Sequence, residues 1–589
     1  MPPVEPSSNR YGYWRSLGEL SNSPEFQESQ RLEFIGGVPD DVKGVSRRRF
    51  MQIMSASIAL AGGAGCRWPK QEILPEVTRP EDFMPGVPRY YATAMELSGV
   101  AQPLLAKSVD GRPIKVDGNP DHPATQTRAG KYALGASNTF SQASTLGLYD
   151  PDRLTTVLNK ANASTWEAFQ SFVGTLFGQL RDVRGAKLRV LSEASSSATL
   201  LSLKRQFLEA FPEAKWFEYE PLSRDAEAAG TRLAFGKAYR AHYALDKAEV
   251  VLALDADLFG THPAAVQYSR DFAKGRNPDG GAMSRLYAIE SNFTPTGAAA
   301  DNRLPWRASD MLKLLLSLEG KLLSESTVRG KTNGVTAVAG GVSYVAGNAK
   351  AEAFLSAVVA DLASHLGKCV IAVGEGQPAE VHAVAHRLNV ILGAVPTCVE
   401  YLVVDEADRP SHTEAIKTLT DEMKAGGVET LLILGGNPVY DAPVDFDFAA
   451  GLGKVANAIH LTEHRNETSR AAGVTWVLPK ANYLESWGDP KAFDGSLCIT
   501  QPLIAPLWGG KSAIEVLALI LGGEGPKDGL ALVRANYNTI VTEGNQDDLW
   551  AAAVHQGFQP NTRYPSERPT PAAGWNPTVP AEWNAASAP

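Results

Sequence analysis

The sequence predicts an α/β fold in which short parallel strands alternate with helices. Three observations support this prediction. Short apolar runs recur after residue 166, several are followed by Gly- or Ser-containing turns, and segments with helical spacing separate them. Hydrophobic residues make up 44% and charged residues 21% of the 589-residue chain, as in globular proteins of several domains. Strands that alternate with helices favour parallel sheets covered by helices on both faces.

The strands and helices are expected in a regular order. A helix over Trp166–Arg181 precedes a strand at Leu188–Leu191, and Ser195-Ser196-Ser197 then caps a helix that runs to Phe211. Five further buried strands are expected at Val250–Leu254, Arg285–Ile289, Cys369–Val373, Thr430–Leu434 and Ala458–Leu461. Ligands of such folds bind at the carboxyl ends of the strands, where the Gly and Ser turns lie.

A compact β region is expected ahead of these elements. Leu104–Val109 and Pro113–Val116 flank Asp110-Gly111, which is a hairpin turn signal. The predicted parts of the chain are a docking segment (1–45), an export signal (46–66), a Pro-rich linker (67–95), the β region (96–155), the α/β domains (156–525) and a C-terminal segment with a Pro-rich tail (526–589).

The export signal begins with consecutive arginines. Arg47, Arg48 and Phe50 precede an apolar run, Ile53–Gly65, of 13 residues. A membrane-spanning helix needs roughly 20 apolar residues, so this run is typical of a signal peptide. The twin-arginine translocase carries proteins that have already folded, often around a cofactor. We therefore expect an exported protein at the periplasmic face of the cytoplasmic membrane.

Cys66 directly follows this signal and is a candidate for lipidation. Small residues precede it, but Gly63 stands where Leu is typical and the nearest leucine is Leu60. A lipid anchor and an unmodified thiol both remain open. A single acyl chain anchors weakly, so stable attachment would need further chains or a membrane partner.

The other cysteines and the net charge exclude several classes of site. Cys369, Cys398 and Cys498 are widely separated, so a metal or cluster site built from them is not expected. Buried free thiols are favoured over a Cys369–Cys398 or Cys398–Cys498 disulfide. The net charge of −9 and the absence of a basic stripe argue against nucleic-acid binding.

Candidate ligand-binding residues follow three of the expected strands. Gly435-Gly436-Asn437 could approach a phosphate closely, although such a run is also a plain tight turn. His262 lies in a loop after another strand, where a hydrogen-bonded structural role is favoured. Glu290 ends a third strand and could contact a ribose or cap a helix. No Ser/His/Asp order, H-E-x-x-H pattern or Walker loop occurs, so no catalytic residues are assigned.

Several ordered motifs resemble the molybdopterin oxidoreductase family. They are Asp110–Pro120, Leu148–Leu154, Gly435–Pro438, Glu467-Thr468, Val477–Pro479 and Leu484–Gly488. The resemblance covers most of residues 95–510 and implies a fold of the dimethyl sulfoxide reductase type, with Rossmann-like parallel sheets. It also implies a vestigial pterin pocket formed by Ser223, His262, Glu290, Gly435, Gly436 and Asn437.

The departures from this family concern its metal ligands. Family members hold an iron–sulfur cluster with cysteines on either side of the Asp-Gly-Arg hairpin, but Met95–Ala106 and Lys131–Ala136 contain none. Because such clusters need thiolates, the small N-terminal β domain is expected to be degenerate and to lack its cluster. No cysteine occurs near Glu220–Ser223, where a molybdenum ligand would lie, and Ser223 could substitute.

The N-terminal region is similar to the molybdopterin-like subunits of alternative complex III. The matching features are Tyr13–Leu17, the delayed twin-arginine signal and Pro88–Thr93. This resemblance implies a non-catalytic exported scaffold, without a cofactor or metal of its own, in a quinol-oxidising membrane complex. The implied partners are a ferredoxin-like iron–sulfur subunit, a multihaem cytochrome c and quinol-binding membrane subunits. Iron–sulfur clusters are expected on a partner or on a missing C-terminal half.

Two alternatives remain open. The first is an active periplasmic oxidoreductase that binds molybdopterin guanine dinucleotide and molybdenum without a protein thiolate. The second is a periplasmic lipoprotein that binds a nucleotide-like ligand. Whether the chain is naturally split or truncated before a Cys-rich half also stays open.

Overall fold

The computed structural model describes residues 84–126, 135–280, 283–329, 345, 347–405, 409–572 and 575, and five residues between Ser21 and Gln27. The chain divides into two compact units, residues 1–83 and 84–589. The predicted export signal (Arg47, Arg48 and Phe50) and the predicted lipidation site, Cys66, lie outside the described residues. Within the described ranges, no helix is both long enough and apolar enough to cross a membrane.

The second unit begins with an antiparallel three-stranded sheet. Its strands are β1 (Arg89–Leu97), β2 (Val100–Val109) and β3 (Arg112–Gly118), in that order. The predicted hairpin is confirmed, since Asp110 and Gly111 both have positive φ, 50° and 75°, at the turn between β2 and β3. β1 starts at Arg89, so the range predicted as linker already includes sheet. Helix α4 (Thr139–Leu148) packs against β3.

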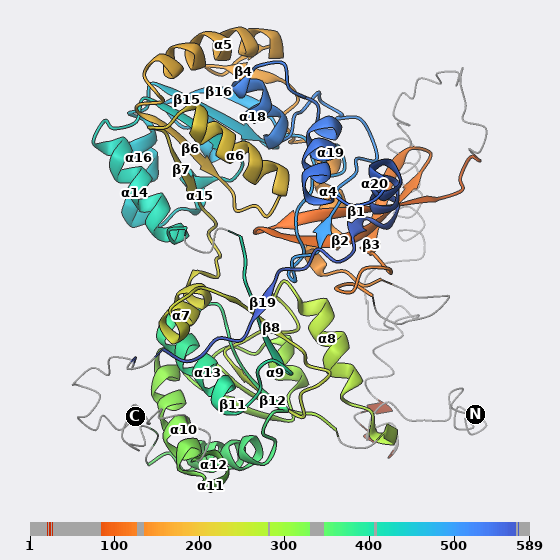
Figure 1. Cartoon of the computed structure of the whole chain (residues 1–589), viewed down its shortest axis with the longest axis vertical. Helices are drawn as coiled ribbons and strands as arrows, with labels where there is room; N and C mark the ends of the chain where they lie inside the picture. The colour runs from red at the N-terminus through yellow and green to blue at the C-terminus, as the bar shows by residue number, and fades with distance from the viewer. Residues whose placement is uncertain are drawn as a thin grey trace, which may run out of the picture. The chain divides into compact units, whose positions relative to one another are not determined.

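A seven-stranded sheet forms the larger α/β layer (Figure 1). Its strand order is β5-β4-β16-β15-β14-β6-β7. The bounds are β4 Val157–Asn159, β5 Asn162–Ser164, β6 Leu188–Ser192, β7 Lys215–Glu218, β14 Thr430–Leu434, β15 Asn457–Thr462 and β16 Val474–Pro479. The five strands from β16 to β7 are parallel, and the chain reverses its direction of travel across the sheet between β6 and β14. Such a reversal is where open α/β sheets bind ligands.

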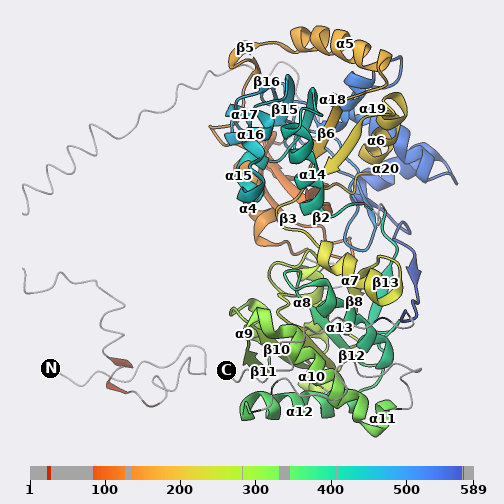
Figure 2. The same cartoon turned by 90° about the vertical axis from the view of Figure 1, so that its left-hand side faces the viewer.

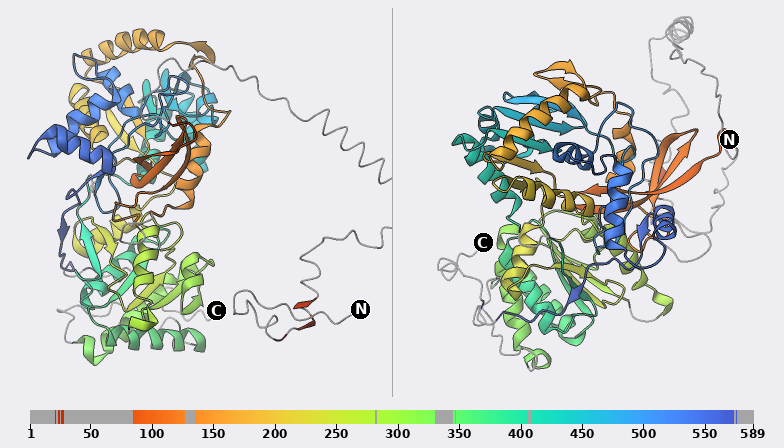
Figure 3. Two further views of the ribbon diagram at one scale, coloured as in Figure 1. Left: turned by 90° about the vertical axis from the view of Figure 1, so that its right-hand side faces the viewer. Right: turned by 45° about the horizontal axis from the view of Figure 1, so that its top comes forward.

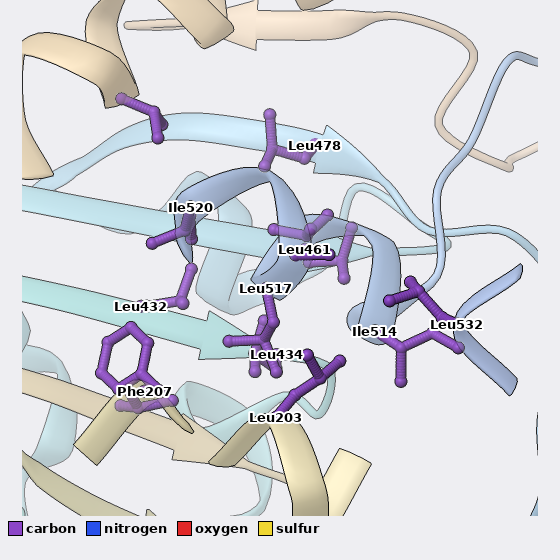
Figure 4. Close-up of a cluster of buried hydrophobic side chains, with 14 of the residues drawn as sticks. Leu203, Phe207, Leu432, Leu434, Leu461, Leu478, Ile514, Leu517, Ile520 and Leu532 are labelled. Carbon is purple, nitrogen blue, oxygen red and sulfur yellow. The ribbon is translucent and has the colours of Figure 1, made fainter. Parts of the chain in front are cut away.

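Alternate residues of each central strand face opposite helical layers. Leu432 and Leu434 of β14 pack with α5 (Trp166–Asp182), α6 (Ala198–Ala210) and α18 (Ala513–Leu521), as Figure 4 shows in part. Leu431 and Ile433 pack with α14 (His412–Lys424) and α16 (Phe448–Leu452) on the other face. Because both faces of β14 are buried, four of its five residues are apolar. This apolar run is why the two ends of the strand could be predicted from the sequence.

A four-stranded parallel sheet forms the second α/β layer (Figure 2). Its order is β11-β10-β9-β12, with β9 at Val250–Leu254, β10 at Arg285–Glu290, β11 at Asn302–Pro305 and β12 at Cys369–Val373. One face packs on α10 (Met311–Ser324), α12 (Ala349–Ser364) and α13 (Ala379–Ile391), and the other face on α8 (Ala265–Lys274). In chain order this layer is inserted between β7 and β14 of the larger sheet, together with α7 (Asp225–Phe235), β8 (Arg240–Tyr243) and β13 (Val399–Leu402).

The C-terminal residues pack on both layers rather than forming only a tail (Figure 3). Helices α19 (Gly529–Ile540) and α20 (Gln546–Gln556) join the core of the larger sheet. The residues that follow α20, 558–572 and Trp575, are here called the C-terminal strap. Within the strap, β18 (Phe558–Gln559) pairs with β17 (Leu497–Cys498), and β19 (Ser566–Glu567) pairs with β13. Trp575 packs on the core of the four-stranded sheet.

The three cysteines of this unit are free and buried, as the sequence favoured. Cys369 and Cys398 lie close enough to influence each other. Burial, followed by the neighbouring Cys398, raises the pKa of Cys369 to about 12. These thiols are therefore protonated and unreactive at neutral pH.

Candidate functional site

A cavity of about 1000 Å³ lies at the carboxyl ends of strands from both α/β sheets. The segment Ala194–Ser196 after β6 and the segment Glu220–Asp225 after β7 line it from the larger sheet. Glu375, which follows β12, lines it from the smaller sheet, and Tyr564 belongs to the C-terminal strap. The cavity is thus where the fold would place a ligand.

Carboxylates outnumber arginines around this cavity. The lining acids are Glu218, Glu220, Asp225, Glu227, Glu375, Asp405 and Glu414, and the lining arginines are Arg224, Arg232, Arg240 and Arg409. Within the described residues, no group of three or more His, Cys, Asp or Glu side chains is arranged to hold a metal ion.

The N-terminus of α6 lies at this edge, where its free N–H groups and the helix dipole both favour negative charge. Glu96, from the end of β1, accepts hydrogen bonds there from Ser195 Oγ at 2.8 Å and from Ser196 N at 2.5 Å. Ser196 Oγ donates a third bond at 3.0 Å. Burial raises the pKa of Glu96, although these bonds from the serines oppose the rise.

A second carboxylate, Asp489, completes the same helix end. It is buried and accepts hydrogen bonds from Thr199 N at 3.0 Å, from Thr199 Oγ1 at 2.7 Å and from Ser197 Oγ. Asn536 Nδ2 of α19 adds a bond at 3.2 Å. Burial raises the pKa of Asp489, while the bonds from Ser197 and Thr199 oppose the rise. The first turn of α6 is therefore bonded to Asp489, and the two residues before its N-cap, Ser195 and Ser196, are bonded to Glu96.

Further charges cluster where β6, β7 and β16 end. Lys480 Nζ lies 2.7 Å from Glu193 Oε2. Burial alone would lower the pKa of Lys480, but Glu193 and Glu463 raise it overall. Glu220 accepts a bond from Ala194 N at 3.0 Å, and burial, followed by the charge of Glu193, raises its pKa to about 8.

The predicted Gly435-Gly436-Asn437 turn lies at this same edge, after β14. Gly435 and Gly436 have φ of 94° and 75°, which only glycine adopts readily. A Cβ on Gly435 would stand 2.0 Å from Glu193 Oε2, so the glycine leaves room for that carboxylate. Asn437 instead holds the next loop, since its Oδ1 accepts from Thr468 N and Oγ1 at 3.1 and 2.8 Å.

The other predicted residues divide between the cavity and the surrounding structure. Ser223 lines the cavity and donates to Asp225 Oδ2 at 3.0 Å. His262 lies between two lining residues, but its ring packs on Tyr268 and Phe493 at 4.7 and 5.0 Å. Burial first, and then the nearby charge of arginines, holds its pKa well below the usual range.

Glu290 is not among the residues that line the cavity. Its buried carboxylate accepts from Arg303 Nε at 2.5 Å and from Thr294 Oγ1 at 2.6 Å. The carboxylate thus ties together the loop after β10 and the strand β11. It has no exposed oxygen pair to offer a ribose.

The carboxylates at the α6 end were not identified from the sequence. Ser195–Ser197 was recognised as a helix cap, but its partner Glu96 lies about a hundred residues earlier and in another sheet. Asp489 directly follows the motif Leu484–Gly488, which could have drawn attention to it. The position of Asp489 beside this motif was the sequence signal that could have marked it as a candidate site residue.

The strand order and the position of this cavity define an open α/β fold with a site at the carboxyl ends of its strands. Acetylene hydratase from Pelobacter acetylenicus has the same fold, with a TM-score of 0.52 and 12% identity over 73% of this chain and 69% of that one. The predicted fold class, that of a dimethyl sulfoxide reductase-type molybdopterin enzyme, is confirmed.

A relative found by sequence agrees with this fold. The "menaquinone reductase, molybdopterin-binding-like subunit" of Nitratidesulfovibrio vulgaris is 23% identical over 489 residues, which cover 77% of this chain and 67% of that protein. No family model matches the chain. The predicted resemblance to molybdopterin oxidoreductase-like subunits is confirmed by these two similarities.

The residues at the strand ends do not fit the anionic pterin dinucleotide that this fold implies. A pyrophosphate needs free N–H donors and positive charge, as a helix N-terminus supplies. Here Asp489 already accepts from the first turn of α6 and Glu96 from the two serines before its N-cap, while Glu193 is a further carboxylate at the same strand ends. Lys480, the cation among them, is paired with Glu193.

Proposed function

We propose that the chain is a non-catalytic, exported scaffold subunit of a membrane quinol-oxidising electron-transfer complex of the alternative complex III type. Its role would be to hold redox partners in register while carrying no pterin or molybdenum itself. The named relative supports the proposal, because that protein is a molybdopterin-binding-like subunit of a menaquinone reductase.

One observation carries the non-catalytic part of the proposal. Asp489 accepts from Thr199 in the first turn of α6, and Glu96 accepts from Ser195 and Ser196 just before the helix, so a phosphate that used both sets of donors would have to displace two carboxylates. Leaving those carboxylates without their hydrogen bonds would cost about 1–3 kcal/mol for each lost bond. The cofactor would have to offset this cost and also the repulsion from neighbouring carboxylates.

The partners and the location follow from the sequence resemblance. We propose a ferredoxin-like iron–sulfur subunit, a multihaem cytochrome c and quinol-binding membrane subunits as partners, with the iron–sulfur clusters on a partner. We also propose export by the twin-arginine translocase to the periplasmic face of the membrane. If Cys66 carries the anchor, Cys66→Ser releases the subunit from membranes of cells that lack the partner subunits.

Elemental analysis of the native protein tests the proposal. Molybdenum, tungsten and iron are measured on the complex isolated from its membrane and on this chain after separation. The expected result is no molybdenum or tungsten in either sample, and iron in the complex alone. Molybdenum near one atom per chain would overturn the scaffold proposal.

An active molybdenum enzyme is the second candidate, because the fold is shared with acetylene hydratase. In that case Ser223 would be the residue beside the metal, since it lines the cavity. Molybdenum bound to the native chain but lost in Ser223→Ala, without loss of folding, would favour this candidate. A free-standing lipoprotein that binds a nucleotide-like ligand would instead purify without any haem or quinol-binding partner.

A further inference from the structure

We infer that the cavity is a docking site for a segment of a partner subunit that presents a basic side chain flanked by apolar ones. The inference rests on the proposed function, because it requires a partner. It goes beyond that function by assigning both the surface and the chemistry of the docked segment. Three features of the cavity carry it: an apolar rim, a carboxylate without a cation, and arginines that already have partners within the protein.

The rim of the cavity exposes large apolar side chains. Leu222 is 75% exposed, Phe140 56% and Leu97 39%, and all three line the cavity. They come from the loop after β7, from α4 and from the end of β1. Apolar side chains that converge from separate elements around a concave site are typical of a surface that binds another protein.

Inside the rim, Glu220 differs from most of the other acids. Among the described residues Glu414 also has no cation at ion-pair distance, but its carboxylate accepts from Ser411 in the capping box of α14. Glu218 has Lys204 at 2.8 Å, Asp225 has Arg409 at 3.3 Å, and Asp405 has Lys491 at 2.5 Å. Within the described part of the chain, no lysine or arginine lies at ion-pair distance from Glu220, whose hydrogen bond comes from Ala194 N.

A basic side chain placed beside Glu220 would supply the missing charge. The raised pKa of Glu220, about 8, has burial as its first cause, and an incoming cation would lower it. Docking near neutral pH would then release a proton from Glu220. Charge complementarity therefore favours a lysine or arginine as the side chain that enters the cavity.

The arginines of the cavity do not favour an acidic segment. Arg409 is paired with Asp225, and Arg224 has Glu227 and Glu375 at 3.8 Å. Arg224 and Arg240 also lie over the ring of Phe493, at 5.2 and 5.0 Å from its centroid. An acidic segment would have to compete with these carboxylates while it faced the unpaired Glu220.

Photo-crosslinking in the native complex tests the inference. A photoreactive phenylalanine analogue replaces Leu222 at the rim, and in a control protein it replaces Val183, which is 52% exposed at the opposite edge of the larger sheet. The crosslinked peptides are identified by mass spectrometry. The expected result is that Leu222 captures a partner segment containing lysine or arginine, whereas Val183 does not.

Charge variants of the same complex test the role of Glu220. Glu220→Gln is expected to reduce the crosslink yield at position 222 by about tenfold or more, because the incoming cation loses its partner. Glu429→Gln is the matched control, since Glu429 pairs with Lys187 at 2.5 Å at the amino end of β14. The circular dichroism spectrum of each variant verifies its folding.

The outcomes separate this inference from the proposed function. If partners co-purify but Leu222 captures no partner, or captures an acidic segment or this chain itself, the docking inference is wrong and the scaffold proposal stands. An unchanged yield in Glu220→Gln also overturns the inference. If no haem or quinol-binding partner co-purifies at all, the scaffold proposal fails as well.

Discussion

The carboxylate of Glu193 lies 2.7 Å from the ammonium of Lys480, directly over the backbone of Gly435. The three residues follow three parallel strands of one sheet, β6, β16 and β14. At the carboxyl ends of these strands, where open α/β sheets bind their ligands, this chain has an internal ion pair. The ion pair connects the residues that follow β6 and β16. Substitutions of these residues are therefore expected to change the stability of the protein.

Gly435→Ala is expected to destabilise the protein by about 1–3 kcal/mol. Its φ of 94° is strained for alanine, and the new Cβ would push the Glu193 carboxylate away from Lys480. Chemical denaturation measures the change. Gly376→Ala is the matched control, because Gly376 also follows a strand but has open space around its Cβ position. Equal stability losses in the two variants would contradict the explanation.

Lys480→Met is expected to cost about 1–3 kcal/mol, less than for a fully buried pair because Glu193 is 42% exposed. The loss has a physical cause, because Glu193 and Glu463, whose charges raise the pKa of Lys480, would be left without this cation. Adding Glu193→Gln to this variant should recover part of the loss. A double-mutant cycle on urea unfolding measures the coupling, and strictly additive effects would refute it.

Glu220→Gln is expected to stabilise the protein at alkaline pH. The folded pKa of Glu220 is about 8, above the unfolded value of roughly 4.3, so the native state binds the extra proton between these values. The free energy of unfolding of the wild type therefore falls as pH rises through this window. The variant should gain about 1–3 kcal/mol near pH 9 and almost nothing near pH 4, measured by urea titrations. A gain that does not depend on pH would contradict this origin.

Acid should destabilise the protein through two histidines of α13. Burial lowers the pKa of His382 to about 4 and that of His386 to about 3. Because the unfolded value is roughly 6.5, only the unfolded state takes up protons as pH falls towards 4, and stability is lost across that window. His386→Gln should reduce the slope of stability against pH between about 6.5 and 4. Tyr401→Phe, which removes the hydroxyl 3.1 Å from His386 Nδ1, should leave the slope largely unchanged.

The fold was predictable because its central strands are buried on both faces. Val250–Leu254, Cys369–Val373 and Thr430–Leu434 have the ends that their apolar runs indicated. Strand β7, Lys215–Glu218, was missed because it is a four-residue strand at the edge of the sheet, with charges at both ends. Helices α19 and α20 were not predicted, since they lie in the range that was assigned only as a C-terminal segment ahead of the Pro-rich tail.

The site was less predictable because its important contacts are long-range. Local turns reveal glycines such as Gly435, whose conformation the chain itself requires. The acceptor that bonds to Ser195 is Glu96, in a different sheet, and nothing near either residue indicates the other. Glu290 looked like a ribose ligand by position, but only the fold shows that Arg303 and Thr294 hold its carboxylate.

The insertion of the smaller α/β layer has a consequence for biosynthesis. Leu188 of β6 pairs with Thr430 of β14, but the whole four-stranded layer is made between them. At about 5–20 residues per second, the ribosome needs roughly 10–50 s to deliver β14 after β6 has emerged. During that interval the edge of β6 that later pairs with β14 has no partner strand. The nascent chain is therefore expected to need protection from aggregation until β14 has been synthesised.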